Sequence, residues 1–167
     1  SKNVHFNWFV PIHSLGHVEI CLGEPATFTA ILDTVTPFGY QWFGPNGILA
    51  GENDSVLFIP SASLNDTGAY YCRVNTYCGY SFTPFDTLII HVPPTVSFTA
   101  LPNCMSENIA FTNTSTSDDV PMNAYWDFGD GNQSNDFHPN HSYGMNGSYT
   151  IQLNVQSAFG CIDSITS

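Results

Sequence analysis

Basic residues are almost absent from this chain. Its 167 residues include 14 acidic side chains but only one lysine and one arginine, Lys2 and Arg73, so the formal net charge is −12. Proteins that bind nucleic acid neutralise phosphates with basic side chains, so this composition excludes nucleic acid as a partner. The same charge attracts cations, calcium among them.

Helical periodicity and long apolar runs are also missing. No stretch of about a dozen residues repeats apolar positions every three or four residues, as an amphipathic helix does. No apolar run approaches the roughly 20 residues of a membrane-spanning helix, so we expect no membrane insertion. The opening "SKNVHFNW" lacks the basic-then-apolar pattern of a signal peptide. If the protein is exported, we expect a mature chain or a piece of one.

Short strand patterns fill the chain instead. Alternating or aromatic-rich runs such as "AYYCRV" and "YTIQLNV" are separated by turn-forming clusters such as "GPNG" and "LNDTG". Many short strands with frequent turns predict an all-β chain of two tandem β-sandwiches. The sharpest break is the rigid pair Pro93-Pro94. We therefore predict an extended N-terminal segment (1–17), a first sandwich (18–93) and a second sandwich (94–167).

The cysteines do not form a metal-binding pattern. None belongs to a CxxC pair, and no cluster of cysteine and histidine has zinc spacing. Long separations between cysteines are typical of disulfide-bonded proteins in an oxidising, extracytoplasmic compartment. The odd number leaves one thiol unpaired. The five cysteines are Cys21, Cys72, Cys78, Cys104 and Cys161.

The segment "LNDTGAYYC" carries a strong local signature. Its pattern Asp66-x-Gly68-x-Tyr70-x-Cys72, with Trp42 thirty residues before the cysteine, resembles the immunoglobulin (Ig) fold over roughly residues 18–92. The resemblance implies that Asp66, Gly68 and Tyr70 form a tyrosine corner, and that Trp42 packs in the core. We interpret these residues as structural.

One feature departs from the Ig pattern. The position that usually holds the first cysteine of the inter-sheet disulfide is Ala30, and Cys21 precedes that strand. Two pairings remain open for Cys21. An internal match between "CLGEPATFT" and "CMSENIAFT" favours Cys78, which would leave Cys72 as a buried free thiol. Cys72 is the alternative partner.

The run "YWDFGDG", followed by "HPNHSYGMNGSYTIQLNV", resembles the PKD (polycystic kidney disease) domain over about residues 94–167. Glycines permit a tight turn, and aspartates accept backbone N–H bonds that close it, so we interpret this motif as architecture. We expect Trp126 to fill the sandwich interior and Cys104 to pair with Cys161. The motif residues are Trp126, Asp127, Gly129, Asp130, Gly131, His141, Tyr143 and Tyr149.

The resemblance also implies a candidate metal site, because some PKD domains bind calcium. The candidate ligands are Asp118, Asp119, Asp127 and Asp130. We expect no other cofactor. No Ser/His/Asp set or carboxylate pair stands out in a chain with this many acids, so the sequence predicts no enzyme activity.

Four triplets read Asp, then Ser or Thr, then an apolar residue, and resemble the O-glycosylation motif of secreted Bacteroidota proteins. Pairs of this kind at strand starts are the alternative interpretation. A tandem of Ig-like and PKD domains also resembles the large surface proteins of that group. The candidate glycosylation sites are Thr34, Ser55, Thr87 and Ser164.

These features together predict a non-enzymatic extracellular or cell-surface protein, either a segment of an adhesin or a subunit of a filament. In a filament, the apolar stretch "NVHFNWFVPI" would pair with a sheet edge of a neighbouring copy. Expected partners are further copies or domains of the same protein, and surface glycans. The alternative is a carbohydrate- or ligand-binding accessory module of a secreted hydrolase, which an aromatic platform on one sheet face would favour.

Overall fold

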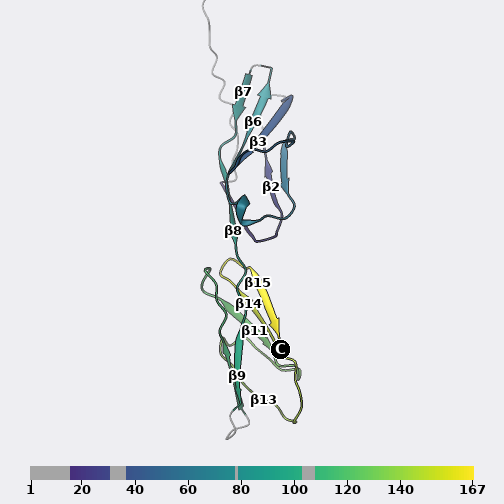
Figure 1. Cartoon of the computed structure of the whole chain (residues 1–167), viewed down its shortest axis with the longest axis vertical. Coiled ribbons are helices and arrows are strands. Elements are labelled where there is room, and N and C mark those ends of the chain that lie inside the picture. The colour runs from purple at the N-terminus through teal and green to yellow at the C-terminus, as the bar shows by residue number, and fades with distance from the viewer. Residues whose placement is uncertain (1–15, 31–36, 78, 103–107) are drawn as a thin grey trace, which may run out of the picture. The chain divides into compact units, whose positions relative to one another are not determined.

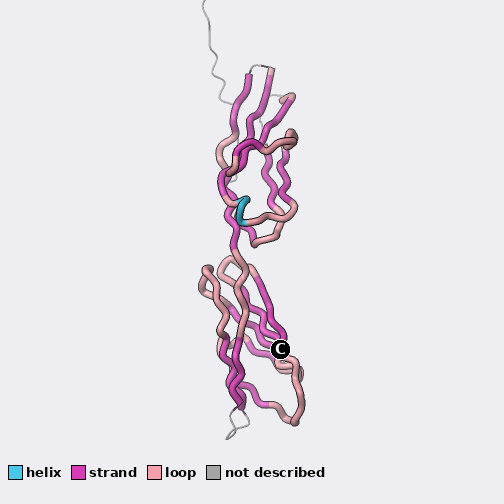
Figure 2. The backbone as a smooth tube through the Cα atoms, viewed as in Figure 1, coloured by secondary structure: helices cyan, strands magenta, loops and turns pink. Residues whose placement is uncertain are grey.

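The computed structural model describes residues 16–30, 37–77, 79–102 and 108–167. Strands account for 52% of the structure and helix for 2%, so the all-β prediction is confirmed. Figure 2 shows strands throughout and one short helical turn. The chain divides into two compact units, Ser1–Ile90 (unit 1) and His91–Ser167 (unit 2). This division falls just before the prolines at which the sequence placed the boundary.

Unit 1 is a sandwich of two sheets (Figure 1). The larger sheet has the order β1-β8-β6-β3-β4, with β7 also paired to β6, and β2 pairs with β5 in the second sheet. A 3-10 turn, η1 (Leu64–Asp66), precedes β6. The strands are β1 (His17–Cys21), β2 (Ala26–Thr29), β3 (Gly39–Gly44), β4 (Gly47–Ile48), β5 (Val56–Ile59), β6 (Gly68–Thr76), β7 (Gly79–Phe82) and β8 (Asp86–His91).

Alternation along the strands builds the core of unit 1. Tyr70, Cys72 and Val74 on β6 are buried at every second position. The ring of Phe28, from the opposite sheet, stacks on Tyr70 with centroids 4.6 Å apart, and Trp42 completes the cluster. The intervening residues of β6 face away from this core.

Unit 2 is a second sandwich, built from the sheets β13-β10-β9 and β12-β11-β14-β15. Trp126 lies at the centre of its core, with rings of Phe98, Phe111 and Phe128 around it. The strands are β9 (Phe98–Pro102), β10 (Asn108–Asn113), β11 (Asn123–Asp127), β12 (Gln133–Ser134), β13 (Asn140–Ser142), β14 (Gln152–Gln156) and β15 (Ile162–Thr166).

Three cysteines lie in the described residues. Cys21 and Cys161 are disulfide-bonded, whereas Cys72 is free and fully buried. The alternative pairing of Cys21 with Cys72 is therefore wrong. Cys78 and Cys104, the other predicted partners, lie outside the described residues.

Candidate functional site

Aromatic side chains gather on the outer face of the large sheet of unit 1. The strand register places Phe43 opposite Tyr71, Arg73 opposite Phe82, and Asn75 opposite Tyr80. These positions alternate with the buried ones, so their side chains leave the sheet on the side away from the core. We define the aromatic face as Phe43, Tyr71, Arg73, Tyr80, Phe82 and Phe85.

Tyr71 is the centre of this face. Its ring stacks on Phe43, with centroids 4.7 Å apart and planes within 3°. Phe82 and Phe85 meet Tyr71 edge-on, at 5.8 Å and 4.8 Å. Stacked and edge-to-face contacts favour a defined ring arrangement, so the face is ordered before any partner binds.

Three rings of the aromatic face remain largely exposed to solvent. Tyr80 is 68% exposed, Phe85 64% and Phe82 48%. Scattered single exposed apolar residues are normal, but a contiguous group of them is typical of an interaction site.

Arg73 lies within these rings, although it is one of only two basic residues in the chain. Its Cζ is 6.0 Å from the ring centroid of Tyr80, within the range of a cation–π interaction. Its Nε is buried and has no hydrogen-bond partner among the described residues. No outward-facing position of β3, β6 or β7 carries a carboxylate, so the face is locally positive in an acidic protein.

Sequence analysis did not identify this face. Its strands come from separate parts of the chain, and only their register brings the rings together. One local signal was available: in "YYCRVN", Tyr71 and Arg73 alternate with the core residues Tyr70, Cys72 and Val74. An aromatic residue beside the only internal arginine, on the solvent side of a strand, indicates a functional surface.

The residues of the Ig-like signature form a structural corner. The hydroxyl of Tyr70 donates to the carbonyl of Asp66 at 2.7 Å. Burial, and then the negative charge of Asp66, raise the pKa of Tyr70 to about 12. Gly68 has a φ of +143° and packs against Pro45. The indole of Trp42 is buried and donates to the carbonyl of Asp54 at 2.9 Å.

The "WDFGDG" motif closes a turn between β11 and β12. Oδ1 of Asp127 accepts the N–H of Gly129 at 2.9 Å, and Oδ1 of Asp130 accepts the N–H of Asn132 at 3.0 Å. Trp126 is fully buried and donates its indole N–H to the carbonyl of Asp136. Both glycines have positive φ, +76° for Gly129 and +91° for Gly131.

His141 joins this turn to β13. Its Nε2 lies 2.9 Å from Oδ2 of Asp130, and its ring stacks on Phe128 with centroids 4.2 Å apart. Burial alone would raise the pKa of Asp130, but bonds from Asn132 and His141 outweigh it and hold the pKa below its ordinary value. Tyr143 adds a bond from its hydroxyl to the carbonyl of Phe128 at 3.0 Å.

Residues 91–167 match the PKD domain family. The match begins at the first residue of unit 2 and runs to Ser167. The matched region contains the Trp126–Gly131 turn, in which Asp127 and Asp130 bond backbone N–H groups.

Solved structures share the fold of the chain. The N-terminal eight Ig domains of Down Syndrome Cell Adhesion Molecule (DSCAM) match 93% of the chain at 14% identity, with a TM-score of 0.69. The chain spans only 26% of that protein fragment. Three N-terminal domains of the highly immunogenic outer capsid protein of bacteriophage RB49 match 88% of the chain, and the chain covers 54% of them, at 12% identity and a TM-score of 0.51.

A PKD domain of known structure also aligns with part of the chain. The PKD1 domain of Epp from Vibrio anguillarum is 27% identical over 46% of the chain, and 90% of that domain is covered, with a TM-score of 0.43.

The four candidate calcium ligands have separate contacts. Asp119 lies 2.9 Å from Nδ1 of His91, Asp127 and Asp130 close the PKD turn, and Asp118 is exposed. Within residues 16–30, 37–77, 79–102 and 108–167, no group of three or more His, Cys, Asp or Glu side chains is placed to hold a metal. Calcium binding stays a prediction.

The candidate glycosylation sites differ in their surroundings. Thr87 and Ser164 are exposed, and Ser55 is half-buried. The N–H and hydroxyl of Ser55 both bond Oδ1 of Asp54, so this Asp-Ser pair has a local structural role. Thr34 lies outside the described residues.

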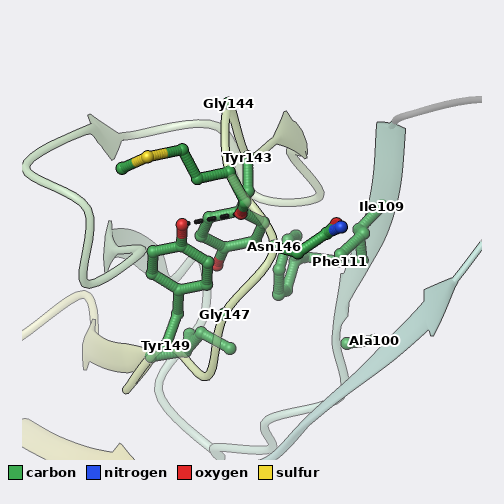
Figure 3. A pocket seen from close by; sticks show the side chains of 10 residues that line it. Ala100, Ile109, Phe111, Tyr143, Gly144, Asn146, Gly147 and Tyr149 are labelled. Carbon is green, nitrogen blue, oxygen red and sulfur yellow. Dashed lines mark hydrogen bonds between the residues drawn. The ribbon is translucent and has the colours of Figure 1, made fainter.

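The PKD domain contains a cavity of about 680 Å³ between β9, β10 and the loop that follows β13. Figure 3 shows the rings of Tyr143 and Tyr149 together on the loop side, facing Phe111. These two rings stack at 3.9 Å, and Tyr149 donates its hydroxyl to the carbonyl of Met145 at 2.8 Å. The lining carries no charged side chain and combines aromatic rings with polar surface from the loop, which makes this cavity a second candidate site for a small ligand.

No helix in the described part of the chain is long and apolar enough to cross a membrane.

Proposed function

We propose that this chain is a non-enzymatic binding module of an extracellular protein, and that it attaches to its ligand through the aromatic face of unit 1. Among the functions predicted from the sequence, an aromatic platform on one sheet face favours the ligand-binding module over the filament subunit. The observation that carries the proposal is the group of exposed rings around Arg73 on β3, β6 and β7. An aromatic face offers a large apolar area with little conformational entropy to lose on binding.

The surroundings of this face support a binding role over a purely structural one. Tyr71 and Phe43 stack on each other, while Tyr80 and Phe82 extend the surface toward β7. Exposed rings add nothing to the core of unit 1 and leave apolar area in water. A ligand that covers them recovers that free energy.

An extracellular location agrees with the chemistry of the chain. Cys21 and Cys161 are disulfide-bonded, and disulfides persist in oxidising compartments. Ig-like and PKD domains are typical of extracellular proteins. The proposal extends to a large surface protein of the kind that the sequence resembles in Bacteroidota.

The described titratable groups with shifted pKa values are engaged in structure. Tyr70 closes the corner, Asp130 closes the PKD turn, and burial raises the pKa of the Cys72 thiol. A nucleophilic cysteine needs the opposite shift, a lowered pKa that favours the thiolate. These observations support an adhesive role without turnover.

A binding panel tests the proposal. Wild-type protein, Phe82→Ser and Phe58→Ser are compared for retention on insoluble polysaccharides and on immobilised extracellular matrix proteins. Phe58 is the matched control, because it is 56% exposed on β5 of the other sheet. We expect saturable binding that Phe82→Ser loses and Phe58→Ser keeps, with the bound material recovered uncleaved. Equal loss in both variants, or cleavage of the ligand, would contradict the proposal.

The filament prediction depends on residues 1–15, which lie outside the described residues. It stays a separate prediction, and negative-stain electron microscopy of the protein tests it: filaments support it, and single short rods contradict it.

A further inference from the structure

We propose that the ligand of the aromatic face is a polysaccharide that carries carboxylates, with Arg73 binding a carboxylate and the rings stacking on sugar rings. This inference rests on the proposed function of the aromatic face and names the chemical class of its ligand.

Arg73 selects the charge of the ligand. Its Nε is buried without a hydrogen-bond partner among the described residues, and its Cζ lies 6.0 Å from the ring centroid of Tyr80. A buried donor without an acceptor costs free energy that a bound acceptor would recover. A carboxylate is the best match, because its two oxygens fit the planar fork of donors on a guanidinium group.

The rings select the shape of the ligand. Phe43 and Tyr71 stack on each other, and the more exposed rings of Tyr80, Phe82 and Phe85 offer apolar surface to a ligand. The C–H face of a sugar ring is apolar and covers such a surface, while its hydroxyls point outward. The hydroxyl of Tyr80 and the amide of Asn75, opposite each other in the register, supply polar groups at the border.

The aromatic face extends over several strands, as an extended polymer does. Its residues line neither the cavity near Tyr143 nor the hollow beside Tyr125. A small molecule binds in a concave site, whereas an extended polysaccharide can lie across several strands.

Charge argues against a second copy of this chain as the occupant. Two copies would bring together two chains of net charge −12, and each face would present the same cation to the other. Charge also argues against a basic partner protein, because this face offers the cation of Arg73 and no carboxylate. Acidic groups elsewhere on the chain are screened from a bound polysaccharide beyond about 8 Å at physiological salt.

The test compares one polymer with and without its charge. Polygalacturonate fragments and their methyl esters are titrated into wild-type protein by calorimetry. Four variants are titrated in parallel: Arg73→Gln, Arg73→Lys, Phe82→Ser and the control Phe58→Ser. Thermal unfolding verifies that each variant is folded, and sedimentation equilibrium records its association state.

We expect the wild type to bind polygalacturonate at least about tenfold more tightly than the methyl ester, the scale of one charge-assisted contact. Arg73→Gln should remove this preference. Arg73→Lys should keep part of it, because lysine retains the charge but not the fork. Phe82→Ser should weaken binding of both polymers, and Phe58→Ser should change neither.

The outcomes separate the two proposals. If both polymers bind equally and Arg73→Gln has no effect, but Phe82→Ser loses both, the carboxylate inference is overturned and the aromatic face remains the binding site. If no polysaccharide binds and the wild type self-associates through Phe82, the occupant is a second copy and the inference is overturned. If Phe82→Ser behaves as the wild type toward every probe, both proposals fail.

Discussion

Oδ2 of Asp130 and Nε2 of His141 lie 2.9 Å apart and connect the turn after β11 to β13 on the opposite sheet of the PKD domain. The same carboxylate accepts the backbone N–H and the side-chain amide of Asn132. One aspartate therefore closes its own turn and ties the two sheets together. The position of His141, eleven residues further along the chain, makes this contact possible.

This arrangement predicts acid sensitivity. The folded pKa of Asp130 lies below its ordinary value of 3.8, so its contribution to stability is present above that pH and is lost as pH falls through the folded pKa. The variant Asp130→Asn lacks this contribution. Denaturant unfolding between about pH 4.5 and pH 2.5 should therefore show a steeper loss of stability in the wild type than in the variant.

Asp118→Asn, at an exposed position, is the control and should follow the wild type. Identical slopes for the wild type and Asp130→Asn would refute the role of this carboxylate.

The two glycines of the turn should tolerate substitution differently. Both have positive φ, which costs an alanine about 1–2 kcal/mol. A Cβ at Gly129 would in addition collide with the backbone carbonyl of Thr150, whereas a Cβ at Gly131 meets nothing within 4 Å. We expect Gly129→Ala to lower the free energy of unfolding by more than about 3 kcal/mol and Gly131→Ala by about 1. Chemical denaturation measures the free energy of unfolding of both variants. Equal losses in the two variants would contradict the close approach of Gly129 to the backbone of Thr150.

The tyrosine corner of unit 1 should contribute through its hydroxyl. Tyr70→Phe removes the bond to the carbonyl of Asp66 and should cost about 1 kcal/mol. Tyr80→Phe, at an exposed position of the same unit, should cost little. The raised pKa of Tyr70, about 12, means that its stabilisation is complete below the ordinary pKa of 10 and is lost as pH rises toward 12. Absorbance titration should find one tyrosinate that Tyr70→Phe abolishes at this high pH. Ionisation of Tyr70 near pH 10 would contradict the burial of this side chain and its hydrogen bond to Asp66.

The sequence predicted the folds better than the site. Local signatures identified both sandwiches, because the Asp66–Cys72 run and the Trp126–Gly131 turn are contiguous and their geometry is local. The aromatic face depends on register: Phe43, Tyr71 and Phe82 meet only because β3 and β7 both pair with β6. The alternative pairing of Cys21 with Cys72 failed because the packing of the two sheets, and not separation along the chain, buries Cys72 as a free thiol.

The cysteines yield a direct chemical prediction. Cys21 and Cys161 are disulfide-bonded, and Cys72 is free. We therefore expect mass mapping of peptides from the non-reduced protein to find Cys21 and Cys161 in disulfide-linked peptides and Cys72 in none. Cys72, whose thiol pKa is raised by burial, should react with an alkylating reagent only after unfolding. Peptides that link Cys21 to Cys78 and Cys104 to Cys161 would confirm the predicted pairings, whereas a peptide that links Cys72 to another cysteine would contradict the structure.

The most direct test of the proposed function is a map of the ligand on the folded protein. Backbone amide shifts are recorded by NMR during titration with hexagalacturonate and, separately, with cellohexaose. The account predicts that shifts caused by hexagalacturonate concentrate on β3, β6 and β7, around Tyr71, Arg73 and Phe82. Shifts confined to the cavity near Tyr143 and Tyr149, or no shifts with either sugar, would contradict it.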